Sequence, residues 1–369
     1  MSESKAVTHI AGTFVIEAPA SFLNGAGLGE GEDRNVTVPK TFRDGQYRVP
    51  YVSSQAWKRW LRNTLIEETK WPVSELRALE VNEKGNTNKI GGEFNPVDFP
   101  EDDIFGYMRA EKGQGKSKAS DEDEEDEDKK LAGKKTRALM RASPFSASIL
   151  VSLRKTGWQG RDEGFVHLKE GSPQPYTTEF YNSNMQAVFC LNYKRLGLFM
   201  NVGDRIELDE GKAEEFLKNK RIAVKKDEGK SGKIYEMSDA KTKRKERATA
   251  LLRALSRLRG GAKQAAFGTD VSPKVLIVAG LTCGNPIFNS LLIDDGNGPI
   301  VKIDTLKEVV RDYADRIVTP VYVGIRKGYL KNENAVTALS GIKENGVPLV
   351  VTTPIDASEQ IAKLLNQSG

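Results

Sequence analysis

The chain has 369 residues, of which 38% are hydrophobic, so it can bury the core of one elaborate domain or of two simple ones. Only two histidines and two cysteines occur, which leaves little material for a zinc site or for histidine-centred catalysis. The net charge is +5, but residues 121–128 read DEDEEDED, and without these eight acids the remainder carries 5 − (−8) = +13. A remainder this basic favours a polyanionic partner, although basic residues spread for solubility are the alternative.

The first half of the chain predicts a strand, a polar excursion and a helix. Alternating side chains indicate a strand over His9–Glu17. Residues 23–46 are rich in glycine and polar residues, which predicts an excursion from the core. A helix then begins near Ser53 or Ser54, either of which can cap it, and its buried stripe comprises Trp57, Trp60, Leu61, Thr64 and Leu65. Residues 111–136 are charged and of low complexity, and we expect a disordered loop there.

The second half predicts two more strands, a long helix and a buried strand. Strands are expected at Ala147–Leu153 and Met185–Tyr193, with a basic excursion between them. A helix from about Arg244 to Arg259 should end at Gly260–Gly261. The apolar run Lys274–Gly280 is typical of a central strand. Later elements, including a strand at 321–325 and a helix capped by Asp356, are expected as additions around the core.

The confident elements follow the order strand, helix, strand, strand, helix, strand. This is the split β-α-β order of a ferredoxin-like or RRM-type α+β core. The sequence lacks the aromatic signature of RRM proteins, so stacking of bases on an open sheet is not predicted. Cys190 lies in an apolar run, and we expect it to be a buried free thiol.

The amino terminus lacks the apolar segment of a signal peptide, and the longest apolar run, at 275–281, is too short to span a bilayer. The sequence therefore predicts a soluble cytoplasmic protein with no membrane partner.

The helix that begins near Ser53 is a candidate phosphate site. The first turn of a helix presents unpaired N–H groups and the positive end of its dipole. Ser53 and Ser54 would add hydroxyl donors. The spacing places one polar strip along the helix, made of Gln55, Lys58, Arg59 and Arg62. Such cations bind backbone phosphates without reading bases; the alternative is an ordinary surface helix with solvated cations.

Two further stretches are candidates for nucleic-acid contact. In RGGAKQAAF at 259–267, the two glycines let the backbone approach a ligand, while Lys263 and Gln264 supply a charge and an amide. The alternative there is a glycine cap beside a solvated lysine. In DDIFGYM at 102–108, Phe105, Tyr107 and Met108 could stack on bases or wedge between them, or could belong to the core. Residues 110–117 fit a degenerate phosphate-loop pattern but follow no strand, and we set them aside.

Four stretches together resemble one protein family. In chain order they are YRVPYVSSQAWKRWLR, DDIFGYM, YTTEFYNSNMQAVF and GGAKQAAFGTDVSPKVLIVAG. They are similar to the backbone subunit of CRISPR Cascade surveillance complexes (the Cas "seven" protein of the RAMP superfamily), and most closely to the DevR-type subunit of type I-B systems. The resemblance runs from the first strand to about residue 290.

The resemblance implies a single elaborated domain over 1–369 shaped like a right hand. An RRM-like palm would occupy about 8–24, 48–69, 145–153, 185–200 and 243–290. A finger would occupy about 25–47 and 70–140, including the acidic loop at 111–136. A thumb would occupy about 144–184, and C-terminal additions would cover 295–369.

The resemblance also implies a non-catalytic scaffold without cofactor or metal. Its partners would be guide crRNA, target DNA through the crRNA, other copies of itself in a helical filament, and other Cascade subunits. Copies would polymerise along the guide, grip its phosphate backbone and kink it at intervals, so that the segments between kinks pair with target DNA. Because such a polymer serves any guide, it should hold RNA by backbone and shape.

Residue by residue, the resemblance assigns a guide-binding surface and a cationic thumb. Met108 would be the wedge beside a displaced base. The guide-contacting set is Asn24, Arg48, Ser53, Ser54, Gln55, Lys58, Arg59, Arg62, Phe105, Met108, Lys263 and Gln264, and the thumb carries Arg154, Lys155 and Arg161. Gly25 departs from relatives that place a cation there, and the acidic run at 121–128 is not a family feature.

Two alternatives remain open. Type III relatives cleave target RNA with an aspartate in the loop after the first strand, and Asp33 lies in such a loop. The chain could instead be a stand-alone regulator that binds single-stranded RNA, which would not need the thumb excursion. Loss of RNA cleavage in Asp33→Ala would support the first, and monomeric behaviour with RNA the second.

Overall fold

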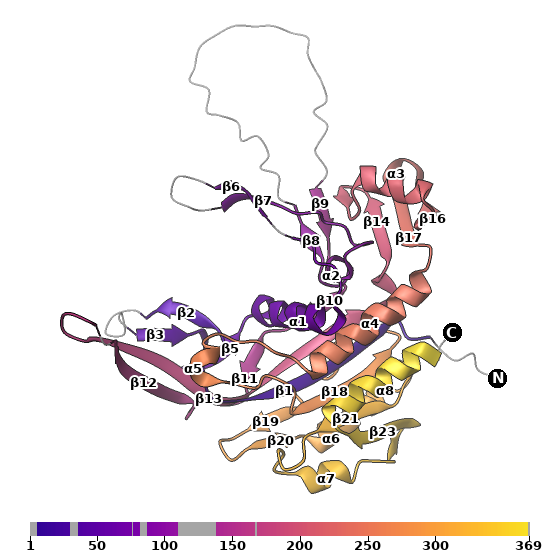
Figure 1. Ribbon diagram of the computed structural model, residues 1–369. Helices are drawn as coiled ribbons and strands as arrows, with labels where there is room; N and C mark the ends of the chain where they lie inside the picture. The colour runs from indigo at the N-terminus through magenta and orange to yellow at the C-terminus, as the bar shows by residue number, and fades with distance from the viewer. Residues whose placement is uncertain are drawn as a thin grey trace, which may run out of the picture. The chain divides into compact units, whose positions relative to one another are not determined.

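The computed structural model describes residues 6–29, 36–75, 77–81, 87–109, 138–166 and 168–367 of a mixed α+β protein (Figure 1). The chain forms two compact units. Unit 1 comprises residues 1–70, 144–194 and 241–369, and unit 2 comprises residues 71–143 and 195–240. The expected disordered loop at 111–136, the phosphate-loop look-alike at 110–117 and Asp33 lie outside the described residues.

Unit 1 is built on one large sheet whose main path runs β22-β23-β21-β18-β1-β13-β11-β5-β4. Strands β3, β10 and β12 also pair with β13, and β2 pairs with β3. The strands are β1 (His9–Ser21), β2 (Gly25–Leu28), β3 (Val36–Pro39), β4 (Thr41–Asp44), β5 (Tyr47–Val52), β10 (Phe145–Ala147), β11 (Leu150–Ser152), β12 (Gln159–Val166), β13 (Gln174–Asn192), β18 (Val275–Leu281), β21 (Val321–Ile325), β22 (Lys343–Glu344) and β23 (Val347–Thr352).

Six helices and a separate hairpin accompany this sheet in the part of unit 1 that the structure describes. The hairpin is formed by β19 (Leu292–Asp294) and β20 (Pro299–Val301). The helices are α1 (Ser54–Thr69), α4 (Ala240–Ser256), α5 (Gln264–Phe267), α6 (Ile303–Asp312), α7 (Glu333–Thr337) and α8 (Pro354–Gln367), and a 3-10 turn spans Tyr193–Arg195.

The central strand β1 pairs antiparallel with β13 on one side and β18 on the other. Its alternating side chains divide the sheet into two faces, because successive residues of a strand point in opposite directions. On the first face, the Phe189 ring lies over Gly12, where an added Cβ would come within 2.6 Å of that ring. Trp57 of α1 packs edge-on against Phe14 at 5.3 Å and against Phe145 at 5.9 Å between ring centroids. This aromatic cluster fixes α1 to the sheet.

The second face is covered by the C-terminal region. Ala11, Val15 and Ile277 belong to a buried apolar cluster that also contains Leu306 of α6 and Val336 of α7. The same region extends the sheet past β18, because β21 pairs with β18 and β23 pairs with β21. The sequence predicts residues 295–369 as additions around the core, but their described part, up to residue 367, supplies strands of the core sheet as well as its cover.

Several predicted elements are confirmed, and others are shifted for identifiable reasons. Strands β1, β18 and β21 lie where the apolar patterns place them, and α1 begins at Ser54 with Ser53 as its cap. Strand β13 begins well before Met185, because the polar segment from Gln174 pairs with β12 outside the apolar core. Cys190 is confirmed as a buried free thiol, and burial raises its pKa to about 11.

Two predicted helix ends are wrong. The helix expected to reach Arg259 ends at Ser256, and Gly260 and Gly261 lie farther on in a loop with positive φ. The helix expected to be capped by Asp356 begins at Pro354. Thr353 performs this role, because its Oγ1 accepts a hydrogen bond from the Asp356 N–H at 3.1 Å. Asp356 lies instead in the first turn, where its charge complements the helix dipole.

Unit 2 contains a second sheet with strand order β16-β17-β14-β15-β9-β8. Its apolar core includes Phe199, Phe216 and Ile222. The elements are β6 (Arg77–Val81), β7 (Thr87–Gly91), α2 (Pro100–Phe105), β8 (Tyr107–Met108), β9 (Ala138–Arg141), β14 (Leu198–Val202), β15 (Arg205–Ile206), α3 (Glu210–Lys218), β16 (Ile222–Asp227), a 3-10 turn (Gly229–Ser231) and β17 (Gly232–Met237).

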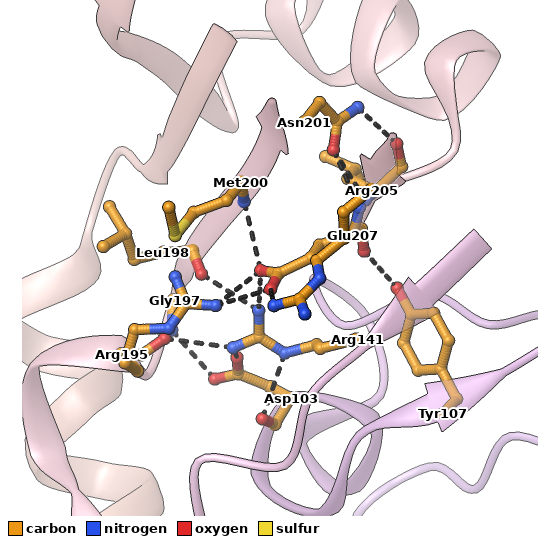
Figure 2. Close-up of polar contacts among 11 residues, drawn as sticks. Asp103, Tyr107, Arg141, Arg195, Gly197, Leu198, Met200, Asn201, Arg205 and Glu207 are labelled. Atoms are coloured by element: carbon orange, nitrogen blue, oxygen red, sulfur yellow. Dashed lines mark hydrogen bonds and ion pairs between the residues drawn. The ribbon is translucent and has the colours of Figure 1, made fainter. Parts of the chain in front are cut away.

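A buried ion network joins the segments of unit 2 (Figure 2). The Arg141 side chain is fully buried between the carboxylates of Asp103 and Glu207. Its Nε donates to the Asp103 carbonyl at 3.2 Å, and its terminal nitrogens donate to both carboxylates and to the carbonyls of Leu198 and Arg195. All five guanidinium N–H groups therefore have acceptors, which is the condition under which a buried charge is tolerated.

We predict that Trp57→Ala lowers the free energy of unfolding by about 3 to 5 kcal/mol, because it removes a fully buried indole from the aromatic cluster. Denaturant titration followed by circular dichroism measures this. Leu28→Ala is the control, since Leu28 is 66% exposed and its truncation should change stability by less than about 0.5 kcal/mol. Equal effects of the two substitutions would show that the cluster does not anchor α1.

Candidate nucleic-acid interface

Three segments of unit 1 meet at the loop 22–24, directly after β1. The Leu23 carbonyl accepts a hydrogen bond from the Ala262 N–H at 2.9 Å, and the Leu23 N–H donates to the Tyr181 hydroxyl of β13 at 2.9 Å. The Asn24 side-chain oxygen accepts from the Ser53 N–H at 3.1 Å. The loop therefore fastens the start of α1, the glycine loop 259–264 and β13 to one another.

The start of α1, which the sequence predicts as an anion site, is capped by Ser53. Ser53 is extended, and its Oγ accepts from the Ala56 N–H at 3.3 Å. The first turn contains no acidic residue. Gln55 and Arg59 are exposed, whereas Lys58 and Arg62 are half-buried. Partial burial lowers the pKa of Lys58 from its ordinary value, so an anion nearby would favour its charged form.

The glycine loop 259–264 approaches α1 closely. Gly260 has φ +147°, and an added Cβ would lie 2.3 Å from the Trp60 side chain. The Gln264 amide donates to the Gly260 carbonyl, which closes the loop on itself. Lys263 is exposed at a left-handed φ of 50°, and its Nζ donates to Thr178 Oγ1 at 2.7 Å and lies 5.0 Å from the Phe22 ring centroid. The loop thus holds one cation beside β13.

Two predicted contact residues have structural partners within unit 1. Asn24 uses its side-chain oxygen on Ser53, which leaves its NH₂ group as the donor for any ligand. Arg48 pairs with the buried Glu179 at 3.1 Å, and its guanidinium lies 5.9 Å from the Trp158 ring centroid. The Trp158 indole donates to the Arg48 carbonyl at 2.8 Å. Arg48 therefore ties β5 to the β12–β13 hairpin.

The three cations predicted for the thumb lie in different environments. Arg154 Nε pairs with the fully buried Asp294 carboxylate at 2.9 Å, where the excursion between β11 and β12 begins. Lys155 pairs with Asp44 at 2.7 Å, and both side chains are largely exposed. Arg161 is exposed on β12. Arg154 consequently belongs to the base of the hairpin, whereas Lys155 and Arg161 face solvent.

Phe105 and Met108 lie in unit 2. Phe105 ends α2 and is half-buried, and Met108 in β8 is 62% exposed. Tyr107 between them packs against Phe94 at 5.3 Å, and its hydroxyl donates to the Glu207 carbonyl at 2.5 Å. Of the three side chains in DDIFGYM that could contact a base, Met108 is the exposed one.

Sequence reasoning missed three residues that shape the interface of unit 1. Phe22 lies beneath the Lys263 ammonium, Thr178 accepts its hydrogen bond, and Tyr181 holds the loop 22–24. Burial raises the pKa of Tyr181. The stretch YTTEFYN, rich in aromatic and hydroxyl side chains at the base of an excursion, is the signal that could have indicated the last two.

Within the part of the chain that the structure describes, no group of three or more His, Cys, Asp or Glu side chains could hold a metal ion. None of the described helices is both long enough and apolar enough to cross a bilayer.

The protein has an α+β fold. On its connected segments around the loop 22–24 lie the amino terminus of α1, the cationic face of that helix and the glycine loop with Lys263. These are features of proteins that hold phosphates. The family described as "CRISPR-associated negative auto-regulator DevR/Csa2" matches residues 31–296, which is more than half of the chain. The chain belongs to this family, and the DevR-type resemblance of the four stretches is confirmed. No curated protein matches the chain.

Solved structures share this fold at low sequence identity. A chain of a "CRISPR RNA-guided surveillance complex, pre-nicking" is similar with a TM-score of 0.53 and 13% identity, over 97% of this chain and 100% of that chain. A chain of another "CRISPR RNA-guided surveillance complex" has a TM-score of 0.49 and 13% identity, over 97% of this chain and 99% of that one. The first likeness supports the fold, and the second is too weak to add to it.

The carboxylate of Asp294 predicts a pH-dependent contribution to stability. Burial raises its pKa, but hydrogen bonds from Asn184 at 2.7 Å, from the Gly296 N–H at 2.9 Å and from Arg154 at 2.9 Å outweigh burial and hold the pKa below its ordinary value. Because its pKa is lower in the folded protein, the ionised Asp294 carboxylate stabilises the fold. This contribution is complete above the pKa of the unfolded chain, about 3.9, and is lost as the pH falls through the pKa of the folded protein.

We therefore expect Asp294→Asn to be less stable than wild type at pH 7, with the difference narrowing as the pH falls below about 4. Thermal unfolding across this pH range measures it. Asp315→Asn, which removes an exposed carboxylate paired with Arg316, is the control and should stay within about 1 kcal/mol of wild type throughout. A difference for Asp294→Asn that is constant with pH would contradict the assignment.

Proposed function

We propose that this chain is a non-catalytic backbone subunit of a type I CRISPR surveillance (Cascade) complex that polymerises along guide crRNA. The observation that carries the proposal is the convergence of the start of α1, the loop 22–24 and the glycine loop on β13, in a chain of a CRISPR-associated family. The guide backbone would run across these segments. Type I-B assignment follows from the DevR-type resemblance.

The grip on the guide is electrostatic and independent of sequence. Phosphates would lie at the start of α1, beside Ser53, Ser54 and Gln55, and along Lys58, Arg59 and Arg62. Lys263 and Gln264 would add contacts from the glycine loop, and the Asn24 amide would complete the surface. Side chains of this kind bind phosphates and leave base edges free. Guide bases would then remain available for pairing with target DNA.

The sheet order supports a ferredoxin-like palm. Taken as the strands of a split β-α-β unit, β1, β11, β13 and β18 lie in the order β18-β1-β13-β11 with α1 and α4 as the connecting helices. RRM proteins stack bases on the open face of such a sheet. Here that face is covered by the C-terminal region, so the guide would follow the segments around α1 instead.

The β12–β13 hairpin is proposed as the thumb that reaches a neighbouring copy. It projects from the sheet next to β2 and β3 (Figure 1). Its outer part exposes large apolar side chains, namely Phe165, Val166, Leu168 and Tyr176. Several exposed large apolar side chains on one hairpin favour a surface that is covered in an assembly. Lys155 and Arg161 would lie close to the neighbouring guide segment.

In unit 2, exposed Met108 is proposed as the wedge that displaces one guide base at each kink, and half-buried Phe105 as a further contact. Polarisable, flexible methionine side chains suit insertion between bases, as apolar wedges do in nucleic-acid binding proteins. The finger of the resemblance, about 25–47 and 70–140, would include most of the first segment of this unit, residues 71–143.

Co-expression with a repeat-spacer RNA tests the proposal. We expect the purified chain to retain this RNA and to form filaments with a regular repeat in negative-stain electron micrographs. Intact target RNA in a metal-containing assay would agree with a non-catalytic role. Retention of no RNA would overturn the proposal, and RNA bound by single, unassembled chains would favour the stand-alone regulator.

The salt dependence of binding tests the grip. The double variant Lys58→Ala/Arg59→Ala should reduce the slope of log K against log salt by about 0.7 for each phosphate that is no longer neutralised, on any guide sequence. Filter binding on the chain freed of RNA measures this. Arg311→Ala/Arg316→Ala removes the same charge from exposed positions in the C-terminal region and should leave the slope unchanged. Equal changes in the two doubles would mean that only overall charge matters.

A further inference from the structure

We propose that Arg141 is a positioning residue for Met108, and that the buried network of Arg141, Asp103 and Glu207 holds the exposed methionine in one fixed position within unit 2. The inference rests on the proposed function of Met108. It assigns a role to a charged cluster whose three side chains are fully buried and that the grip on the guide does not use.

The Met108 segment is attached to the backbone of the Arg141 strand. In the β8–β9 ladder, Tyr107 lies opposite Arg141 and Met108 lies opposite Met140. Gly106 has φ +71°, and a Cβ added there would lie 2.3 Å from the Arg141 carbonyl oxygen. The turn before Met108 therefore packs directly against the backbone of β9. A displacement of Arg141 would move Met108 with it.

The Arg141 side chain holds the same segment from its other end. Asp103 in α2 lies five positions before Met108, and both its carboxylate and its carbonyl accept hydrogen bonds from Arg141. The second Asp103 oxygen accepts from the Gly197 N–H at 2.9 Å. Arg141 therefore contacts both ends of residues 103–108. Its side chain binds Asp103, as Figure 2 shows, and its strand pairs with the segment that contains Met108.

Glu207 adds a further connection between the charged network and the Met108 segment. Its carboxylate accepts from Arg141 at 3.1 Å, from Arg195 at 2.6 Å and from the Met200 N–H at 3.1 Å. Its carbonyl accepts from the Tyr107 hydroxyl at 2.5 Å. Glu207 thereby connects the charged network to the residue directly before Met108, and Figure 2 shows both contacts.

The energetics of buried ion pairs favour a positioning role over a purely stabilising one. Removing three charges from water is costly, and apolar residues of similar volume commonly match or exceed the stability of such a network. What an ion network provides is one defined geometry, because each of the five guanidinium N–H groups here has a specific acceptor. A wedge that must enter the guide at one point needs a single, well-defined position, and the network provides it.

The test reads base displacement directly. Complexes assembled on guide RNA and bound to complementary DNA are treated with dimethyl sulfate, because displaced guide bases remain unpaired and reactive while paired bases are protected. Wild type should show reactive bases at regular intervals. Met108→Ala and Arg141→Lys should each lower these peaks by at least about threefold. Lysine keeps the charge but lacks the planar fork that reaches both carboxylates.

Controls separate positioning from folding. Guide retention should stay within about threefold of wild type in Arg141→Lys, and Met108→Ala/Arg141→Lys should lower the peaks no further than Met108→Ala alone. Asp103→Asn, which keeps the side-chain volume, is a milder second variant with the same expected effect. Arg221→Lys alters an exposed ion pair with Asp98 in the same unit and should leave the peaks unchanged.

The outcomes distinguish this inference from the proposed function. If Met108→Ala lowers the peaks while Arg141→Lys and Asp103→Asn match wild type, the role of Arg141 is overturned and the proposed function stands. If the Arg141 and Asp103 variants lose guide and peaks together, their role is structural only, which also overturns the inference. Absence of regular peaks in wild type would overturn the proposed kinking of the guide itself.

Discussion

Phe189 packs over Gly12 in the middle of the central strand, and the arrangement of unit 1 follows from this contact. Only a residue without a side chain leaves room for the ring there. Phe189 then stacks on Phe145 at 5.9 Å, and together with Phe14 these rings receive Trp57 of α1. With its apolar side fixed in this cluster, α1 exposes Gln55 and Arg59 and leaves Lys58 and Arg62 half-buried.

Next to this fixed helix, hydrogen bonds that mostly involve backbone groups hold the segments of the candidate interface together. Leu23 holds the glycine loop and β13, and Asn24 holds the cap residue Ser53, so that Ser53 and Lys263 belong to one connected surface. Hydrogen bonds of this kind have fixed directions, which charged side chains on the surface do not. If this surface binds a guide as proposed, its fixed geometry would set the register of the guide backbone without base contacts.

The cations of the chain divide into two groups that the sequence does not separate. Arg48, Arg141 and Arg154 are paired with buried carboxylates that lie 131, 38 and 140 positions away along the chain. Arg59 and Arg161 lie at exposed positions of the surface. A basic residue in a motif looks the same in either case, because its partner is brought close only by the fold. Nothing near Arg48 in the sequence indicates Glu179, and no local pattern indicates the network around Arg141.

Several features could be predicted from residues that are neighbours along the chain or share one periodic face. These are the start of α1, the central strands β1 and β18, the buried thiol of Cys190 and the family resemblance. Other features could be seen only in the folded chain. These are the residue at which α4 ends, the capping of α8 by Thr353, and the way the C-terminal region extends and covers the sheet. The pairing of Arg48, Arg141 and Arg154 with buried carboxylates is another feature of this second kind. All of them depend on contacts between groups whose distance in space is set by the packing of the elements, and spacing and composition along the chain carry no information about that distance.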